Sequence, residues 1–217
     1  MFAKNYARHY ELFHNDKPYK EEIDFVCKWA RKPRSILDIG CGTAHYWEYF
    51  WKHDAFVIGV EKSKEMIASS KHGPRIDCLD AAGIGNFKRK ITFDAATALF
   101  DVINYIPWHG WWKDVPLKNG GYFVFDIWDT EKVKADGFKK TVKTVGGLTR
   151  TIEPLTQDDK KVELLVNVFD GEISATEVHK MFLYSHKDIK KFCGNKFEII
   201  ETKATEGWQK WYKLRRK

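Results

Sequence analysis

The chain has 217 residues, of which 37 are basic and 30 acidic, so that its formal net charge is +7. This length suits one domain with a complete core, and no apolar run approaches the roughly 18 residues that a membrane-spanning helix needs. The first residues also lack the apolar stretch of a signal peptide. We therefore expect a soluble, cytoplasmic protein that makes no contact with a membrane.

The cysteines and the basic residues exclude some classes of site and favour others. Cys27, Cys41, Cys78 and Cys193 lie far apart without a Cys-x-x-Cys pair, which predicts neither a metal site nor a disulfide framework. The positive charge would help to hold nucleic acid, but the lysines are scattered along the chain, as on a solvated surface. We therefore favour a small-molecule partner over nucleic acid. The sequence leaves open whether the protein forms a homodimer.

The first segments of the chain predict an arm and a helix. Residues 1–19 carry tyrosines among polar residues without a regular spacing, and we expect an N-terminal arm there. From Lys20 on, apolar side chains recur at helical spacing until Pro33, which should end the helix. This helix should pack against a sheet.

A turn with two glycines follows the first predicted strand. The apolar run at 36–39 stops at Gly40-Cys41-Gly42, and a helical pattern opens near Thr43. Glycines let the backbone turn with unusual dihedral angles and let a ligand approach closely, while a helix N-terminus offers free N–H groups. The turn suits a nucleotide, but the same pattern also serves simply to turn the chain.

An acidic residue ends the next predicted strand. The apolar run at 55–60 is typical of a parallel strand buried on both faces, and Glu61 follows it. In nucleotide-binding α/β folds, an acid about twenty residues after the glycine turn accepts hydrogen bonds from the ribose hydroxyls. Alternatively, Glu61 caps the next helix, although Ser63 is better suited to that role. The spacing favours a nucleoside site.

The alternation of strands and helices continues and then changes. Further strands are predicted at 75–79, 92–99 and, after Gly120-Gly121, 122–127, so we expect a doubly wound parallel sheet with its ligand at the carboxyl ends of the strands. Period-two alternation at 148–153, 162–169 and 176–183 then predicts an antiparallel meander. Ser185 and Asp188 should cap a short helix before two closing strands.

These elements predict one domain over residues 1–217. Its fold class is α/β: a Rossmann-like, mostly parallel sheet with a closing antiparallel hairpin and an inserted antiparallel meander that could cover the ligand as a lid. We expect an arm at 1–19, a core at 20–127, the meander at 145–184, and the closing helix and strands at 185–217.

Several motifs together resemble the class I S-adenosylmethionine-dependent methyltransferases. They are Leu37-Asp38-Ile39-Gly40-Cys41-Gly42-Thr43, Glu61, Met66, Asp80-Ala81 and Gly120-Gly121. The resemblance covers roughly residues 20–127. Residues 178–185 with the following helix, and the arm from Tyr10 to Tyr19, are also similar to the small-molecule branch that includes nucleotide-sugar amino N-methyltransferases.

The resemblance implies S-adenosylmethionine as the methyl donor and S-adenosylhomocysteine as the product. It implies that Glu61 holds the ribose, Asp80 and Ala81 meet the adenine, and the arm closes over the cofactor. Ala44 stands where the family usually has a third glycine. The residues implied at the cofactor are Tyr10, Tyr19, Gly40, Cys41, Gly42, Ala44, Glu61, Lys62, Met66, Asp80, Ala81, Leu99 and Phe100.

The acceptor site is predicted from residues near the strand ends. Methyl transfer is an in-line displacement, so catalysis rests mainly on positioning, but an amine must arrive unprotonated and a hydroxyl would benefit from a general base. Candidates for this catalytic role are His109, Asp126 and His179, and for the walls of the acceptor pocket Tyr105, Trp108 and Tyr184. A purely structural role is the alternative for each histidine.

The sequence thus favours an enzyme that methylates a nitrogen or oxygen of a small polar metabolite, such as a nucleotide-linked sugar. One alternative is an RNA (tRNA) methyltransferase, for which the basic surface would matter more. Another is a protein that binds the cofactor without turning it over. A dinucleotide oxidoreductase is less consistent, because Gly-Cys-Gly-Thr-Ala shortens the spacing of the dinucleotide motif.

Overall fold

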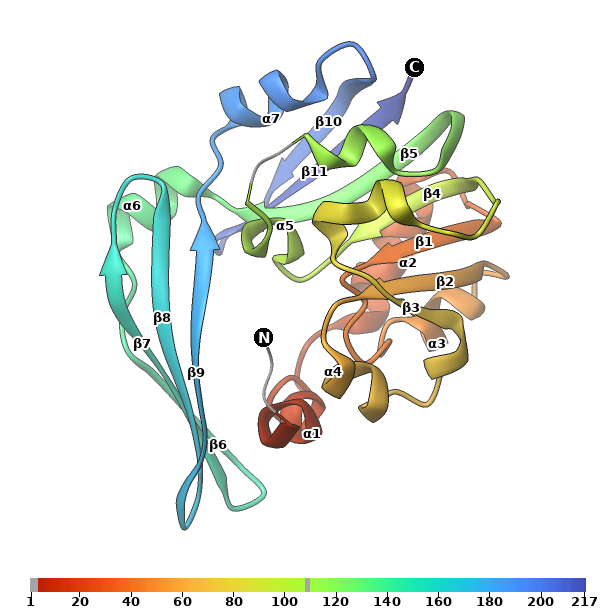
Figure 1. Cartoon of the computed structure of the whole chain (residues 1–217). Helices are drawn as coiled ribbons and strands as arrows, with labels where there is room; N and C mark the ends of the chain where they lie inside the picture. Colours follow the sequence, from red (N-terminus) through yellow and green to blue (C-terminus); the bar gives the residue numbers. More distant parts are fainter. Residues whose placement is uncertain (1–3, 108–109) are drawn as a thin grey trace.

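The computed structural model describes residues 4–107 and 110–217. Its main sheet has the strand order β10-β11-β5-β4-β1-β2-β3 (Figure 1). Strands β1 to β5 are parallel, whereas β11 is antiparallel to β5 and β10 to β11. The strands are β1 (Ser35–Ile39), β2 (Phe56–Glu61), β3 (Ile76–Cys78), β4 (Phe93–Ala98), β5 (Leu117–Trp128), β10 (Phe197–Ala204) and β11 (Gln209–Arg216). The predicted α/β sheet and its closing hairpin are confirmed.

Helices cover both faces of this sheet. Ile23 and Val26 of α2 and Trp47 of α3 pack on one face, while Ile84, Trp112 and the α7 residue Ile189 pack on the other. The helices are α1 (Lys4–Phe13), α2 (Tyr19–Trp29), α3 (Trp47–Trp51), α4 (Lys64–Ser69), α5 (Val102–Tyr105), α6 (Thr130–Asp136) and α7 (His186–Cys193). Short 3-10 helices are η1 (Gly73–Arg75), η2 (Ala81–Asn86) and η3 (Trp111–Asp114).

The meander forms a second, four-stranded antiparallel sheet. Its strands are β6 (Thr141–Val145), β7 (Leu148–Gln157), β8 (Lys161–Asp170) and β9 (Glu172–Phe182), paired in this order. Alternate residues of β8, from Val162 to Val168, are buried, because successive side chains of a strand point to opposite faces. Figure 1 shows this sheet beside the main one, with α1 between β6, β9 and α4.

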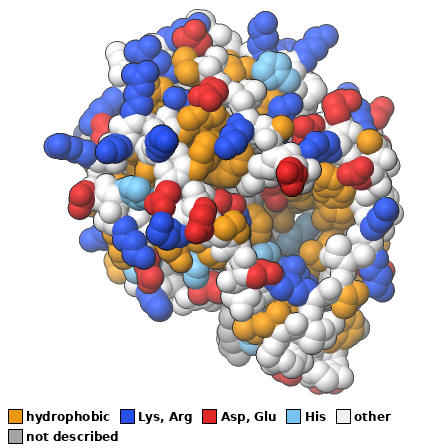
Figure 2. Space-filling view, turned by 180° about the vertical axis from the view of Figure 1, so that it is seen from behind, with side chains coloured by type: hydrophobic (Ala, Val, Ile, Leu, Met, Phe, Trp, Pro, Cys, Tyr) orange, Lys and Arg blue, Asp and Glu red, His pale blue; other side chains and the backbone are white. Residues whose placement is uncertain are grey.

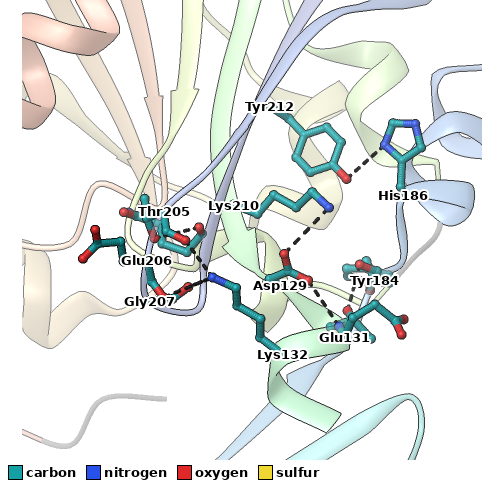
Figure 3. A network of polar contacts seen from close by, with 12 residues as sticks. Asp129, Glu131, Lys132, Tyr184, His186, Thr205, Glu206, Gly207, Lys210 and Tyr212 are labelled. Atoms are coloured by element: carbon teal, nitrogen blue, oxygen red, sulfur yellow. Dashed lines mark hydrogen bonds and ion pairs between the residues drawn. The ribbon is translucent and has the colours of Figure 1, made fainter. Parts of the chain in front are cut away.

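Polar contacts attach α6, which precedes the second sheet, to the hairpin formed by β10 and β11 (Figure 3). The ammonium group of Lys132, on α6, donates to the backbone carbonyls of Thr205, Glu206 and Gly207 at 2.7, 3.0 and 3.1 Å. Lys210 of β11 lies 3.8 Å from the Asp129 carboxylate just before α6. The segment that leaves β5 is therefore held where it turns away from the main sheet.

The structure corrects three local predictions. The N-terminal arm contains the regular helix α1, whose Tyr6 and Phe13 are buried against the antiparallel sheet. The helix expected near Thr43 begins only at Trp47, because Ala44 has a positive φ of 64°. Gly120-Gly121 lies inside β5 rather than before it.

Both predicted helix caps are present. The Ser63 hydroxyl accepts a hydrogen bond of 3.2 Å from the Met66 N–H at the start of α4. Ser185 and Asp188 form a reciprocal capping box at the start of α7, with each side chain accepting from the other residue's backbone N–H. These caps satisfy N–H groups that a helix leaves unpaired at its first turn.

Candidate active site

A cavity of about 650 Å³ lies at the carboxyl ends of the parallel strands. Residues of β1, β2 and the loops after β3 and β4 form one side, and residues of α1 and the antiparallel sheet form the other. A hollow with hydrophobic side chains around it is visible on one face of the molecule (Figure 2). The volume is in the range of small-ligand pockets, and the position is the point where the order of the parallel strands reverses, which is where such sheets bind ligands.

The glycine turn after β1 forms part of the cavity wall. Gly40 and Gly42 have φ angles of +66° and +56°, a conformation that other residues rarely adopt. A Cβ atom at Gly40 would lie 2.6 Å from the Val102 side chain, so the turn requires glycine there. The Gly40 N–H donates to the Val60 carbonyl at 2.8 Å, which ties the turn to β2.

Glu61 is held rigidly beside this turn. One carboxylate oxygen accepts from the Gly42 N–H at 3.0 Å and the other from the Ser63 N–H at 2.8 Å. The residue is only 8% exposed, and burial raises the pKa of its carboxyl while the backbone donors oppose that rise. Each oxygen keeps a lone pair for a further donor, so Glu61 can accept hydrogen bonds from a vicinal diol in the cavity.

The side chain of Asp38, near the end of β1, is the centre of a buried polar cluster. The Asp38 carboxylate accepts from the Trp47 indole N–H at 2.9 Å and from the Thr97 hydroxyl at 3.0 Å. Burial raises the pKa of Asp38 to about 6, against the effect of these two donors. The cluster links β1, β4 and α3 directly below the glycine turn.

Two strained residues follow β4. Phe100 and Asp101 have φ angles of +67° and +61°, which costs energy for residues other than glycine and is typical of functional sites. Both backbone N–H groups donate to the Asp126 carboxylate, at 2.7 and 3.2 Å. Asp126 therefore holds the turn that presents Phe100 and Asp101 to the cavity. Burial raises the pKa of the Asp101 carboxyl and of the Asp126 carboxyl.

Aromatic residues from α1 and α2 cover the same space. The Tyr10 ring lies 4.6 Å from the His14 ring, which lies 4.8 Å from the Phe100 ring. The Tyr19 ring lies 4.2 Å from the ring of His45. The predicted arm thus does reach the cavity: Tyr10 lies on α1, His14 directly follows α1, and Tyr19 begins α2.

The antiparallel sheet contributes polar side chains to the far end of the cavity. His179 Nδ1 lies 2.8 Å from the Tyr105 hydroxyl, and its Nε2 lies 3.1 Å from the Glu177 carboxylate. Arg150 donates to His14 Nε2 at 3.0 Å, and its buried Nε has no hydrogen-bond partner among the described residues. Burial and the Arg150 charge lower the pKa of His14 to about 3, which leaves the imidazole neutral.

Most predicted site residues face this one cavity. Ala44, Asp126 and Tyr184 do not: Ala44 is buried beside the glycine turn, Asp126 lies behind the wall, and the Tyr184 hydroxyl donates to the Ile106 carbonyl in the core. Trp108 and His109 lie outside the described residues. The predicted residues on the wall are Tyr10, Tyr19, Gly40, Cys41, Gly42, Glu61, Lys62, Met66, Asp80, Ala81, Leu99, Phe100, Tyr105 and His179.

Within residues 4–107 and 110–217, no group of three or more histidine, cysteine or acidic side chains could hold a metal ion. In the same ranges, no helix is long and apolar enough to cross a bilayer.

Comparison with protein families identifies the segment that contains the glycine turn and Glu61. Residues 37–125 match a family model described as a methyltransferase domain. The chain carries a class I S-adenosylmethionine-dependent methyltransferase domain. S-adenosylmethionine is accordingly its cofactor.

Solved structures share the fold of this protein over nearly the whole chain. DesVI from Streptomyces venezuelae has a TM-score of 0.79 and 20% identity and covers 100% of both chains. CalS10 from Micromonospora echinaspora, an amino pentose methyltransferase solved with S-adenosylmethionine, has a TM-score of 0.75 and 20% identity and covers 100% of this chain and 98% of its own. These similarities include the antiparallel sheet and therefore extend beyond the matched domain.

A curated relative is similar in sequence over a shorter span. The dTDP-3-amino-3,4,6-trideoxy-alpha-D-glucopyranose N,N-dimethyltransferase of Streptomyces venezuelae is 25% identical over 112 residues. The aligned part covers 49% of this chain and 47% of the relative. The chain thus spans about half the length of that relative.

Proposed function

We propose that the protein transfers a methyl group from S-adenosylmethionine to a nitrogen or oxygen of a small polar metabolite, and that a nucleotide-linked sugar is the favoured class. The observation that carries this proposal is the single cavity shared by the Glu61 clamp and by the polar groups of the antiparallel sheet. A cofactor and a small acceptor can meet there without leaving the protein.

The residues of the parallel sheet suit the cofactor. Glu61 would accept hydrogen bonds from the two ribose hydroxyls, since both of its oxygens are oriented by backbone N–H groups. Asp80 and the Ala81 backbone would meet the adenine, and Met66, which packs beside Gly42, would lie against its ring. The close turn at Gly40 would let the methionine part approach the backbone.

The bound cofactor supplies a methyl group on a positively charged sulfur. The chain has to orient the acceptor behind that methyl and keep water out. Tyr10 and His14 on one side and the apolar face of the antiparallel sheet on the other enclose the space. Asp126 acts through the turn that it holds, so we propose a positioning role for it rather than contact with the acceptor.

Arg150 supports an acceptor with an anionic group. Its guanidinium lies on the cavity wall, is almost fully buried, and has an unpaired Nε–H among the described residues. A planar guanidinium is well suited to phosphate or carboxylate oxygens. A sugar linked to a nucleoside diphosphate would carry such a group, as the substrate named for the curated relative does.

The cover over part of the cavity favours a small acceptor over RNA, because α1 and the antiparallel sheet occupy space that a nucleotide of a polymer would need in order to reach the site. A protein that binds the cofactor without turnover remains the second candidate, since the Glu61 clamp by itself would support binding alone.

The proposal is tested by transfer of a radiolabelled methyl group from S-adenosylmethionine. Acceptors would be fractionated small metabolites, total tRNA, and nucleotide-linked amino sugars, with Glu61→Ala as the negative control. Label in a small-molecule fraction that depends on Glu61 supports the proposal. Label in tRNA alone would favour the RNA acceptor, and cofactor binding without label in any pool would favour the inactive protein.

A further inference from the structure

We propose that His14 is a specificity-determining residue of the acceptor site: its neutral imidazole, held in one tautomer by Arg150, donates a hydrogen bond from Nδ1 to a phosphate oxygen of the acceptor. This inference rests on the proposed function and adds a second anion-binding group beside Arg150. His14 was not among the residues predicted from the sequence.

His14 stands where three parts of the cavity wall meet. It directly follows α1, and the ring of Tyr10 on that helix lies 4.6 Å from its own ring. The ring of Phe100, on the strained turn after β4, lies 4.8 Å away. Arg150 reaches His14 from β7 of the antiparallel sheet. All four residues line the cavity, so His14 has a fixed place between the strand ends and the antiparallel sheet.

The bond from Arg150 determines which nitrogen of His14 carries a hydrogen. A guanidinium group can only donate hydrogen bonds, so His14 Nε2 accepts from Arg150 Nη1, at 3.0 Å, with its lone pair. In a neutral imidazole the hydrogen is then on Nδ1. Within residues 4–107 and 110–217, Nδ1 makes no hydrogen bond. This N–H is therefore available to a ligand in the cavity that His14 lines.

The charges around His14 keep its imidazole neutral. The cations that face it are Arg150 of β7, Lys143 of β6 and Lys17 of the loop between α1 and α2, while Asp16 of the same loop acts in the opposite direction. Burial and these cations lower the pKa of His14 to about 3. An imidazole with so low a pKa is a weak base. His14 therefore serves as a hydrogen-bond donor and does not take a proton from the acceptor.

The same charges select an anionic ligand. Arg150 contributes a buried guanidinium whose Nε has no partner among the described residues, and His14 contributes a second donor one hydrogen bond away. The hydrogen bond from the cation polarises the imidazole, which makes the Nδ1–H group a stronger donor. A diphosphate has oxygens on two phosphorus atoms, so one phosphate can meet the guanidinium while the other accepts from Nδ1. The pair therefore fits the diphosphate of a nucleotide-linked acceptor.

The test is calorimetric titration of the S-adenosylhomocysteine complex with dTDP and with thymidine, which lacks phosphate. Two variants of His14 separate the two nitrogens of the ring. Counted along the side chain, the amide of Gln stands where Nε2 stands and still offers Arg150 an oxygen. The amide of Asn stands where Nδ1 stands and keeps an N–H for the ligand.

We expect His14→Gln to weaken dTDP binding about 10-fold or more, the loss of a hydrogen bond to a charged group. His14→Asn should bind dTDP at least about threefold more tightly than His14→Gln, because it keeps a donor in the place of Nδ1. Thymidine should bind equally to the wild type and to both variants. The ratio of the dTDP affinities of the wild type and His14→Gln should stay constant from about pH 6 to 9, because the imidazole does not titrate there.

NMR spectroscopy separates contact with the ligand from a purely structural role. In ¹⁵N spectra, Nδ1 of His14 should have the shift of a nitrogen that carries hydrogen and Nε2 that of one without, and the Nδ1 signal should move when dTDP binds. Arg150→Met should raise the pKa of His14, because it removes a neighbouring cation. His186→Gln is the matched control, since His186 bonds to Tyr212 at 3.2 Å away from the cavity (Figure 3).

Equal dTDP affinity of the wild type and His14→Gln would overturn the inference, as would a hydrogen on Nε2 of His14 or an affinity ratio that changes with pH. All variants should bind S-adenosylhomocysteine like the wild type, which verifies that they are folded. Weaker binding of S-adenosylhomocysteine alone by His14→Gln would assign the donor to the carboxylate of the cofactor and overturn its role at the acceptor. Absence of S-adenosylhomocysteine binding by the wild type would instead contradict the proposed function itself. Binding of S-adenosylhomocysteine without binding of dTDP would overturn the diphosphate site and leave the cofactor site intact.

Discussion

The backbone N–H of Gly42 donates a 3.0 Å hydrogen bond to the carboxylate of Glu61, 19 residues further along the chain. The glycine turn and the acid are therefore one unit: the acid fixes the conformation of the turn, and the turn orients the acid toward the cavity. Both are on the wall of the same cavity. Changes on either side of this bond should alter the site in ways that can be measured.

Replacement of Ala44 by glycine should stabilise the protein. Ala44 has a φ of +64° directly after the turn, and this left-handed conformation costs a non-glycine residue about 1 kcal/mol or slightly more. We expect Ala44→Gly to raise the free energy of unfolding in urea by roughly 1 kcal/mol. Because Ala44 is not on the cavity wall, affinity for S-adenosylhomocysteine should change less than about threefold. A less stable variant would contradict this account of the strain.

The buried Asp38 should make stability depend on pH. Its pKa is raised from 3.8 to about 6 in the folded protein, so the folded state binds a proton more tightly, and its stabilising contribution is lost as the pH rises from about 4 through 6. Asp38→Asn keeps an acceptor for Trp47 and a donor for Thr97. Between pH 4 and 7, the wild type should lose on the order of 3 kcal/mol relative to this variant. If the free energies of unfolding of the wild type and of Asp38→Asn changed equally over this pH range, the account of Asp38 would be contradicted.

Arg150 should bind the anionic part of the acceptor. Titration of the S-adenosylhomocysteine complex with dTDP is expected to show binding that Arg150→Met weakens roughly 10- to 100-fold, the loss of a hydrogen bond to a charged group. The exposed Lys187 provides a control, since Lys187→Met removes a positive charge outside the cavity. Tyr6→Phe removes one contact of Arg150 and keeps its charge. If Tyr6→Phe weakened dTDP binding as much as Arg150→Met does, the effect would come from the docking of α1 and not from the charge of Arg150.

The parallel sheet and the cofactor side of the site are predictable because their information is local. A buried parallel strand is a continuous apolar run, and Gly40, Gly42 and Glu61 stand at fixed distances from the ends of two such runs. The helix α1 was missed because Tyr6 and Phe13 find their apolar partners only on the antiparallel sheet, far along the chain. Long-range packing of this kind leaves no pattern in a short segment.

The acceptor side was predicted only in part. Arg150 lies on the cavity wall, between Leu148 and Ile152 on β7, and Glu177 is buried on β9, two residues before His179. Polar residues at the positions where a strand otherwise places apolar side chains are the sequence feature that could have identified them. Asp101 has no such pattern, because its place on the wall depends on the strained turn held by Asp126.

The most direct test of the account is calorimetric titration of the purified protein with S-adenosylhomocysteine. We predict that the wild type binds, that Glu61→Ala weakens binding at least about 100-fold by removing a charged acceptor, and that the exposed control Glu198→Gln leaves affinity unchanged. Absence of binding to the wild type, or equal affinity of wild type and Glu61→Ala, would contradict the central claim that the glycine turn and Glu61 form the cofactor site.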